Sequence, residues 1–303
     1  MTDGSSPDAV KSRNFFQLSD HHVVVAVESP EKMLALMQDD DTDKVANILC
    51  EPDEISGTPS MGRTKICKKE FVNVSFTRTV IRNVDFYECV FRQCLFIKSQ
   101  IENCEFHDCR FIDTNTHKIE FKGVYIDPIS FEDCLSPKDH QNIGNHLYQR
   151  LMNNSNDENQ PVFGRLASFE FNRWMSYQLT YEAKRKWKTN KSEAIGLQLN
   201  SLGRKFWGLW GAGVFLDRFI LCFITVILIL STINFSLRTM MGLPDVKIFL
   251  DAVYFTVITL TTIGYGDITP SEPWGKVIMA GQGFMGFFLF ALAASIILRR
   301  IGL

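Results

Sequence analysis

Two long stretches of the chain, residues 219–237 and 277–298, contain no charged side chain and consist mainly of apolar residues. An α-helix needs about 20 apolar residues to cross the hydrocarbon core of a bilayer. Inside lipid the backbone polar groups must be satisfied within the segment itself, so each stretch has to be a helix. A buried core helix could imitate one such stretch but hardly both, so the sequence predicts two membrane spans.

Between these stretches lies a third apolar segment, residues 251–261, which is too short to cross a membrane. Thr-Ile-Gly-Tyr-Gly-Asp follows directly, over residues 262–267. Non-helical backbone at membrane depth is tolerated only where it is buried or lines an aqueous cavity. The pattern therefore predicts a re-entrant half-helix and a loop that face such a cavity. The partly negative C-terminal end of the half-helix favours a cation there.

The loop can supply the oxygen ligands that a dehydrated cation needs, because an extended backbone of alternating handedness turns its carbonyls to one side. Gly264 and Gly266 can adopt positive φ without a Cβ penalty, and Thr262 adds a hydroxyl. The segment resembles the selectivity filter of potassium channels, whose signature is T-V/I-G-Y/F-G-D. The resemblance implies that K⁺ is held at the first four residues of an ion-coordinating filter. The filter consists of Thr262, Ile263, Gly264, Tyr265 and Gly266.

The resemblance also suggests residues that support this filter. Tyr254 and Phe255 take the place of the aromatic pair that braces the filter in potassium channels, and Asp267 ends the signature. Ile258 stands where some bacterial members carry a glutamate behind the filter, so any filter inactivation is expected to differ from theirs.

Three residues of the second span are candidates for gating. Gly286 follows Gly266 at the spacing of the gating-hinge glycine in two-span potassium channels, although close helix packing is the other interpretation. Phe290 and Ala294 follow at four-residue steps on the same face. We expect this face to line the cavity, with Phe290 as a constriction; the alternative is that Phe290 packs on a neighbouring helix.

A second period, of five residues, begins near residue 66. Phe or Ile recurs at positions 66–111 and again from 121 to 131, with a small or β-branched residue two places before most of them. This period fits neither a helix nor a flat strand. It resembles that of pentapeptide-repeat proteins, which implies a right-handed quadrilateral β-helix of roughly three to four coils. The inward positions also account for Cys89, Cys94, Cys104 and Cys109, so a metal cluster is not needed to explain them.

The fold class predicted is thus multidomain: a β-helix, a helical linker and an all-α two-span pore domain with a re-entrant loop. The linker is expected to contain a helix to about residue 153, a loop at 153–157, a helix over 162–187 and an interfacial helix with Trp207 and Trp210. The expected domains are a partly disordered segment at 1–63, the β-helix at 64–135, the linker at 136–210 and the pore domain at 211–303.

Charge sets the expected orientation. Basic residues cluster at 184–188, at 204–205 and at 299–300, whereas the segment between the spans carries more acidic than basic side chains. By the positive-inside rule both termini are cytoplasmic, and the chain is expected in the plasma membrane with the Gly266 end of the loop outside. Few residues follow residue 298, so control of a gate is expected from the N-terminal cytosolic side.

The family resemblance implies a homotetramer in the lipid bilayer that conducts K⁺ passively. We expect K⁺ only as the permeant ion, with no cofactor and no nucleic acid; the sequence names no cytosolic ligand or protein partner. No nucleophile–base set or metal-ligand spacing predicts an enzyme. Two alternatives remain: a cation channel that does not select K⁺, and a membrane-tethered pentapeptide-repeat scaffold.

Overall fold

The computed structural model describes residues 14–19, 23–39, 41–57, 63–209 and 216–301. The chain divides into two compact units, Met1–Leu202 and Gly203–Leu303, which are described separately below. The expected disorder near the N-terminus and the side chains of Trp207 and Trp210 fall outside this description.

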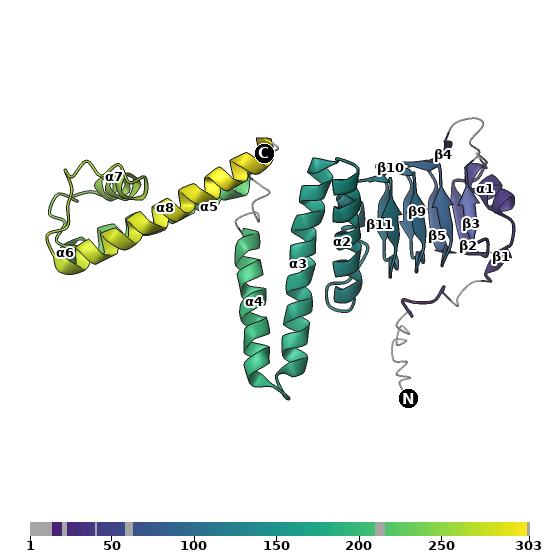
Figure 1. Cartoon of the computed structure of the whole chain (residues 1–303), viewed down its shortest axis with the longest axis horizontal. Helices are drawn as coiled ribbons and strands as arrows, with labels where there is room; N and C mark the ends of the chain where they lie inside the picture. The colour runs from purple at the N-terminus through teal and green to yellow at the C-terminus, as the bar shows by residue number, and fades with distance from the viewer. Residues whose placement is uncertain (1–13, 20–22, 40, 58–62, 210–215, 302–303) are drawn as a thin grey trace, which may run out of the picture. The chain divides into compact units, whose positions relative to one another are not determined.

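The first unit is a β-solenoid in which strands from successive turns pair in parallel (Figure 1). One sheet contains, in order, β1 (Val25–Val27), β2 (Lys44–Cys50), β5 (Glu70–Ser75), β8 (Val90–Arg92) and β11 (Arg110–Ile112). The second contains β4 (Thr64–Cys67), β7 (Val84–Tyr87), β10 (Glu105–His107) and β13 (Tyr125–Ile126). The third contains β3 (Glu54–Ser56), β6 (Val80–Arg82), β9 (Gln100–Glu102) and β12 (Glu120–Lys122). A fourth face has single bridges that join Ser75, Leu95 and Asn115, so the β-helix expected from the five-residue period is confirmed.

Stacked aromatic rings fill the inside of the solenoid. Phe71 stacks on Phe91 with ring centroids 4.8 Å apart, and Phe91 stacks on Phe111 at 4.7 Å. All three rings are buried, as is Phe131, which stacks on Phe111 at 4.3 Å from the short 3₁₀ helix Pro128–Phe131. Each buried Phe side chain contributes on the order of 2–3 kcal/mol of hydrophobic stabilisation, so this column is a main source of the solenoid's stability.

The cysteines of the period lie where the sequence predicts. Cys89, Cys94, Cys104 and Cys109 are buried free thiols. Each lies within hydrogen-bonding range of a carbonyl in the preceding turn, as Cys94 Sγ does at 3.4 Å from the Phe71 oxygen. Within the described residues no cluster of three or more His, Cys, Asp or Glu side chains could hold a metal ion.

The corners of the solenoid require left-handed backbone. From Lys68 to Gly123 every fifth residue has a positive φ, between 47° and 67°. The residues at these corners are Lys, Asn, Arg, Glu, Gln, Asp and one Gly, none of them β-branched or aromatic. Branched and bulky side chains are the least tolerant of this conformation, so the corner positions carry a sequence signal of their own.

The solenoid begins at Val25, before the residue 64 at which the domain was expected to start. Phe71 pairs with Phe91 in the regular turns, but Val45 pairs with Phe71 across an interval that is not a multiple of five. The turn from Val25 to its partner Ile48 also departs from the period, because it holds the helix α1 (Pro30–Gln38), whose buried Met33 and Met37 join the solenoid core. A search for a strict period therefore misses these turns.

Three helices follow the solenoid in the first part of the chain: α2 (Gln141–Asp157), α3 (Pro161–Lys186) and α4 (Lys191–Leu209). The loop predicted at 153–157 is wrong, because α2 continues through it. Asn154 closes the last turn: its amide nitrogen donates to the Val124 carbonyl at 2.8 Å, and its oxygen accepts from the Val124 N–H at 3.1 Å. The buried carboxamide thus replaces the next strand, and this tertiary contact outweighs the low helix propensity of Asn.

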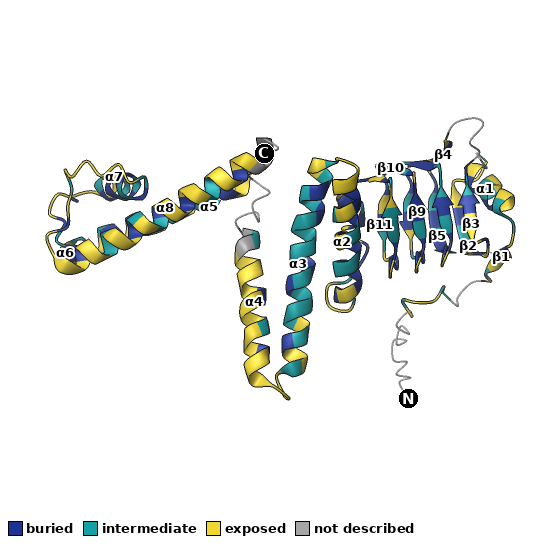
Figure 2. Cartoon of the chain, viewed as in Figure 1, coloured by how far each residue is buried: buried dark blue, intermediate teal, exposed yellow. Residues whose placement is uncertain are grey.

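The second unit contains α5 (Leu216–Ser236), α6 (Arg238–Met241), α7 (Phe249–Leu260) and α8 (Pro273–Ile301). Asp217–Ser236 and Pro273–Leu298 are long and apolar enough to cross a membrane, whereas α7 is not. Most residues of α5 and α8 are exposed (Figure 2). Helices that expose this much apolar surface suit a lipid or protein environment better than water.

A substitution at a corner tests the left-handed backbone. Glu88 is exposed and has φ 54°, so Glu88→Gly is expected to stabilise the solenoid by up to about 1 kcal/mol. The matched control is Lys122→Gly on the exposed face of β12, which should destabilise it by about 0.5–1 kcal/mol. Amide hydrogen exchange of the full chain in detergent measures both. Faster exchange in Glu88→Gly would contradict the assignment.

Candidate functional site

The candidate site is the loop that follows α7. The helix starts where the Asp251 carboxylate accepts the backbone N–H groups of Lys247 and Ile248, at 2.8 and 2.9 Å. At its other end, the carbonyl of Ile258 accepts the N–H groups of Ile263 and Gly264, at 3.0 and 3.2 Å. The last turn of α7 therefore holds the first half of the loop, and the Ile258 side chain is buried beneath it.

The loop backbone alternates in handedness. Thr262, Gly264 and Gly266 have φ values of 56°, 52° and 79°, while Ile263 and Tyr265 are not among the residues with positive φ. Two of the three left-handed positions are glycine, which adopts them without strain. The third is threonine, a β-branched residue for which this conformation is costly. Such strain often marks a functional site.

The structure brings the expected supporting residues to the loop in different ways. The Tyr254 hydroxyl donates to the Asp267 carboxylate at 2.7 Å, which ties α7 to the end of the loop. Phe255 is buried in a core cluster with Met241, Val246 and Ala252, and it also lines the hollow beside Gly264 and Gly266. Tyr254 therefore contacts the loop end directly, and Phe255 holds the helix from behind.

The loop is open to solvent in the single chain. Ile263 is 55% exposed and Tyr265 is 72% exposed, and the other residues from 262 to 267 are exposed as well. A hollow of about 290 Å³ lies beside it, lined mainly by apolar residues of α7 and α8 together with Gly264 and Gly266. A strained, apolar and uncovered loop of this kind needs further protein around it to exclude lipid.

A buried polar network joins the helices behind the loop. The Asn234 amide nitrogen of α5 donates to Thr256 Oγ1 of α7 at 2.9 Å and to Gln282 Oε1 of α8 at 3.1 Å. Gln282 Nε2 returns a bond to Asn234 Oδ1 at 2.8 Å. All three side chains are buried. Sequence reasoning missed this network, although Asn234 and Gln282 are the single amides of the two uncharged stretches.

The gating candidates of α8 lie in unlike surroundings. A Cβ on Gly286 would be 1.9 Å from the carbonyl oxygen of Leu260, the last residue of α7, so here the glycine permits a close helix contact. Phe290 and Ala294, one and two turns further on, are exposed in the single chain. The hinge role of Gly286 and the gate role of Phe290 and Ala294 stay predictions.

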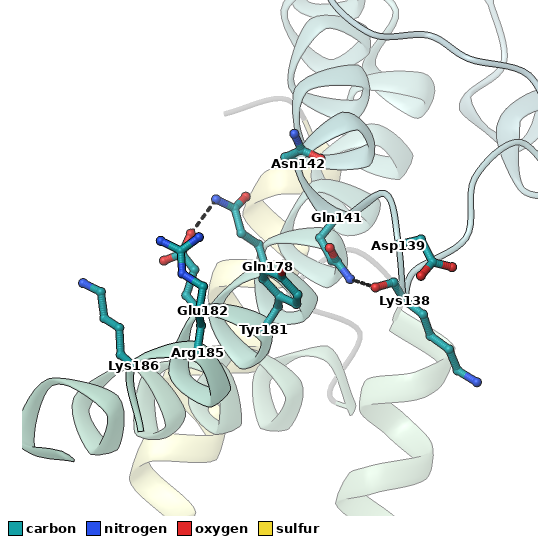
Figure 3. A pocket seen from close by; sticks show the side chains of 9 residues that line it. All are labelled: Lys138, Asp139, Gln141, Asn142, Gln178, Tyr181, Glu182, Arg185 and Lys186. Carbon is teal, nitrogen blue, oxygen red and sulfur yellow. Dashed lines mark hydrogen bonds between the residues drawn. The ribbon is translucent and has the colours of Figure 1, made fainter. Parts of the chain in front are cut away.

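A separate polar hollow of about 610 Å³ lies between the start of α2 and the end of α3 (Figure 3). Several of its side chains already have partners: Gln178 donates to Glu182 at 2.9 Å, Gln141 donates to the Lys138 backbone carbonyl, and Lys186 pairs with Glu193 outside the hollow. Three cations and two carboxylates line it, so the hollow selects neither charge. We read it as a solvated groove.

The polar network can be tested by a double-mutant cycle. Asn234→Leu and Gln282→Leu each leave a buried amide without its partner, so each should cost about 1–2 kcal/mol, and the double variant should cost less than their sum. Reversible unfolding of the full chain in mixed micelles measures these differences. Ser231→Ala is the control, because this buried hydroxyl bonds only within α5, to the Ile227 carbonyl. Additive costs would show that the two amides do not interact.

The close contact at Gly286 gives a second test. Gly286→Ala forces a methyl group onto a backbone oxygen, and overpacking of this kind costs about 1–3 kcal/mol. Gly281→Ala is the matched control, since no atom lies within 4 Å of its added Cβ and alanine favours a helix. We expect only Gly286→Ala to have a lower transition temperature than the wild type in thermal unfolding measured in detergent. Equal shifts in the two variants would contradict the contact.

Comparison with known families separates the two parts of the chain. Residues 208–302 match the ion-channel family, and residues 76–119 match the pentapeptide repeats. A calcium-gated potassium channel of Thermoplasma volcanium is 31% identical over 91 residues, which cover 28% of this chain and 26% of the relative.

Two other relatives match a shorter segment. A hyperpolarization-activated voltage-gated potassium channel of Methanocaldococcus jannaschii is 45% identical over 53 residues, 18% of this chain and 24% of that protein. Human potassium voltage-gated channel subfamily KQT member 4 is 45% identical over 53 residues, 8% of its length. The chain thus spans about a quarter or less of these relatives. Residues 208–302 are thus similar to the ion-channel domain of potassium channels, in a chain that also matches pentapeptide repeats and whose helices α5 and α8 are long and apolar enough to cross a membrane.

Proposed function

We propose that the chain assembles as a homotetramer that conducts K⁺ selectively through the loop Thr262–Gly266. The observation that carries this proposal is the alternation of left-handed backbone at Thr262, Gly264 and Gly266. Alternating handedness can direct successive peptide oxygens to the same side of an extended strand. Carbonyl oxygens so arranged can replace the water shell of a dehydrated K⁺ ion.

The tetramer follows from the number of ligands that an ion needs. One chain contributes one loop, so a closed ring of oxygens requires several copies around an axis. The exposed Ile263 and Tyr265 support this, because a neighbouring subunit would cover side chains that the single chain leaves open. In the proposed assembly K⁺ is held at Thr262, Ile263, Gly264 and Tyr265, and no cofactor takes part.

The supporting contacts favour a rigid filter. The hydrogen bond from Tyr254 to Asp267 and the pair of bonds to the Ile258 carbonyl fix both ends of the loop to α7. A filter must hold its oxygens in place so that they cannot collapse onto a smaller ion. We infer that these two contacts, together with the buried Phe255, supply that resistance.

In our proposal the chain lies in the plasma membrane with both termini cytoplasmic. Basic residues at 184–188 and 204–205 precede α5, and the acidic Asp267 lies at the other end of the loop. Gating would act from the N-terminal cytosolic side, because α4 ends at Leu209 and α5 begins at Leu216. The moving part would be α8, with Gly286 as a hinge and Phe290 and Ala294 at the constriction.

Flux into liposomes that contain the purified protein tests the proposal. We expect K⁺ flux well above Na⁺ flux under matched gradients. Gly264→Ala should abolish the K⁺ flux, since the added Cβ costs roughly 1–2 kcal/mol at the left-handed position 264 in each of the four subunits. Thr269→Ala, at an exposed residue beyond the loop, should conduct as the wild type does.

The outcomes separate the alternatives. Equal K⁺ and Na⁺ flux would support a nonselective cation channel. No flux of either ion, from protein that is folded and inserted, would support a membrane-tethered scaffold. Unchanged K⁺ flux in Gly264→Ala would contradict the proposed role of the loop.

A further inference from the structure

An apolar stripe runs along one side of α4. Ile195, Leu199 and Leu202 are 49%, 64% and 53% exposed, and Phe206 continues the same spacing. Figure 2 shows that α4 is exposed along most of its length. Aliphatic side chains at successive steps of four and three residues lie on one face of a helix, so they form a continuous strip.

The stripe does not face α3. The side of α4 that contacts α3 carries the small residues Ala194 and Ser201, both buried. Ser201 Oγ lies 2.7 Å from Thr180 Oγ1 and donates to the Ser176 carbonyl at 2.9 Å. The side of α4 toward α3 therefore carries small side chains and the half-buried Leu197, whereas the stripe residues lie on another side of the helix.

Glycines beside the stripe are a second, independent observation. Gly196 and Gly203 each follow a stripe residue, and a Cβ built on either would meet nothing within 4 Å. Neither glycine has a positive φ, so no backbone requirement explains it. Glycine in a helix interior is less favourable than alanine. Its usual benefit is that it lets another helix approach closely, as it does at Gly286.

The spacing and charge of α4 identify the partner. Steps of four, three and four residues are those of a coiled-coil seam, in which apolar side chains interlock between helices. A helix that lies on a membrane surface has a strongly basic polar face. The charged side chains of α4 are Lys191, Glu193, Arg204 and Lys205. On a helical wheel Glu193 and Arg204 lie opposite the stripe and cancel, so the polar face is not strongly basic. The surface suits another copy of the same helix better than a lipid surface.

We propose that α4 helices from the copies of this chain pack in parallel through Ile195, Leu199 and Leu202, with Gly196 and Gly203 at the flanks. This inference rests on the proposed homotetramer, in which four copies of α4 would belong to one assembly. A seam of only two heptads is weak by itself, but tethering raises the effective concentration of the helices. The bundle would then be the device that links the cytosolic part to α5.

Parallel packing places each residue next to its own copies, so single cysteines report it directly. In the full chain with Cys67→Ser and Cys222→Ser, Leu199→Cys and Leu202→Cys should form cross-linked subunits under mild oxidation in liposomes. Asn200→Cys is the matched control: it is equally exposed, but it lies off the seam. We expect cross-linking at 199 and 202 to exceed that at 200 several-fold. Because two seam positions are tested, the result does not depend on one variant that could misfold.

Flux and subunit number, measured on the same liposomes, distinguish this inference from the proposed function. A conducting tetramer without cross-links at 199 and 202 would overturn the bundle and leave the channel intact. A monomer without flux would overturn both. If a lipid-borne quencher reaches a fluorophore at position 199 but not at position 200, the stripe lies on the bilayer and the bundle is refuted.

Discussion

The second unit depends on one constraint: a strained, non-helical loop has to be held between two helices that are long and apolar enough to cross a membrane. Backbone polar groups in lipid find no water, so the surrounding helices must satisfy or shield them. In the last turn of α7, the Ile258 carbonyl accepts two N–H groups of the loop. The Tyr254 hydroxyl donates to Asp267 at the other end of the loop. Gly286 lets α8 lie against the end of α7. The remaining exposure of the loop is what the proposed tetramer would cover.

The network of Asn234, Thr256 and Gln282 also helps to hold the helices around the loop in place. Three buried polar side chains from three helices satisfy one another, and this fixes how α5 and α8 flank α7. Within lipid such bonds are individually modest. Their contribution here is to fix position, because the helices cannot slide past one another without breaking these bonds.

Left-handed backbone recurs in both units, for different reasons. In the solenoid it turns a corner at every fifth residue, and a repeated Phe column offsets its cost. In the loop no comparable apolar column exists within the chain. A left-handed backbone is costly for residues with a Cβ. The corners place unbranched polar residues there, and the loop uses glycine at Gly264 and Gly266.

Local patterns in the sequence determined much of this protein. The uncharged stretches required helices, the five-residue period required a β-helix, and the alternating glycines allowed a left-handed loop. Tertiary structure decided the rest. The first turns of the solenoid break the period: the turn from Val25 to Ile48 holds α1, and Val45 pairs with Phe71 across an interval that is not a multiple of five. The Asn-rich end of α2 is helical only because Asn154 closes the last turn through Val124. The partners of Asn234 and the contact of Gly286 come from helices far away in the chain, and no local pattern encodes a distance between segments that meet only on folding.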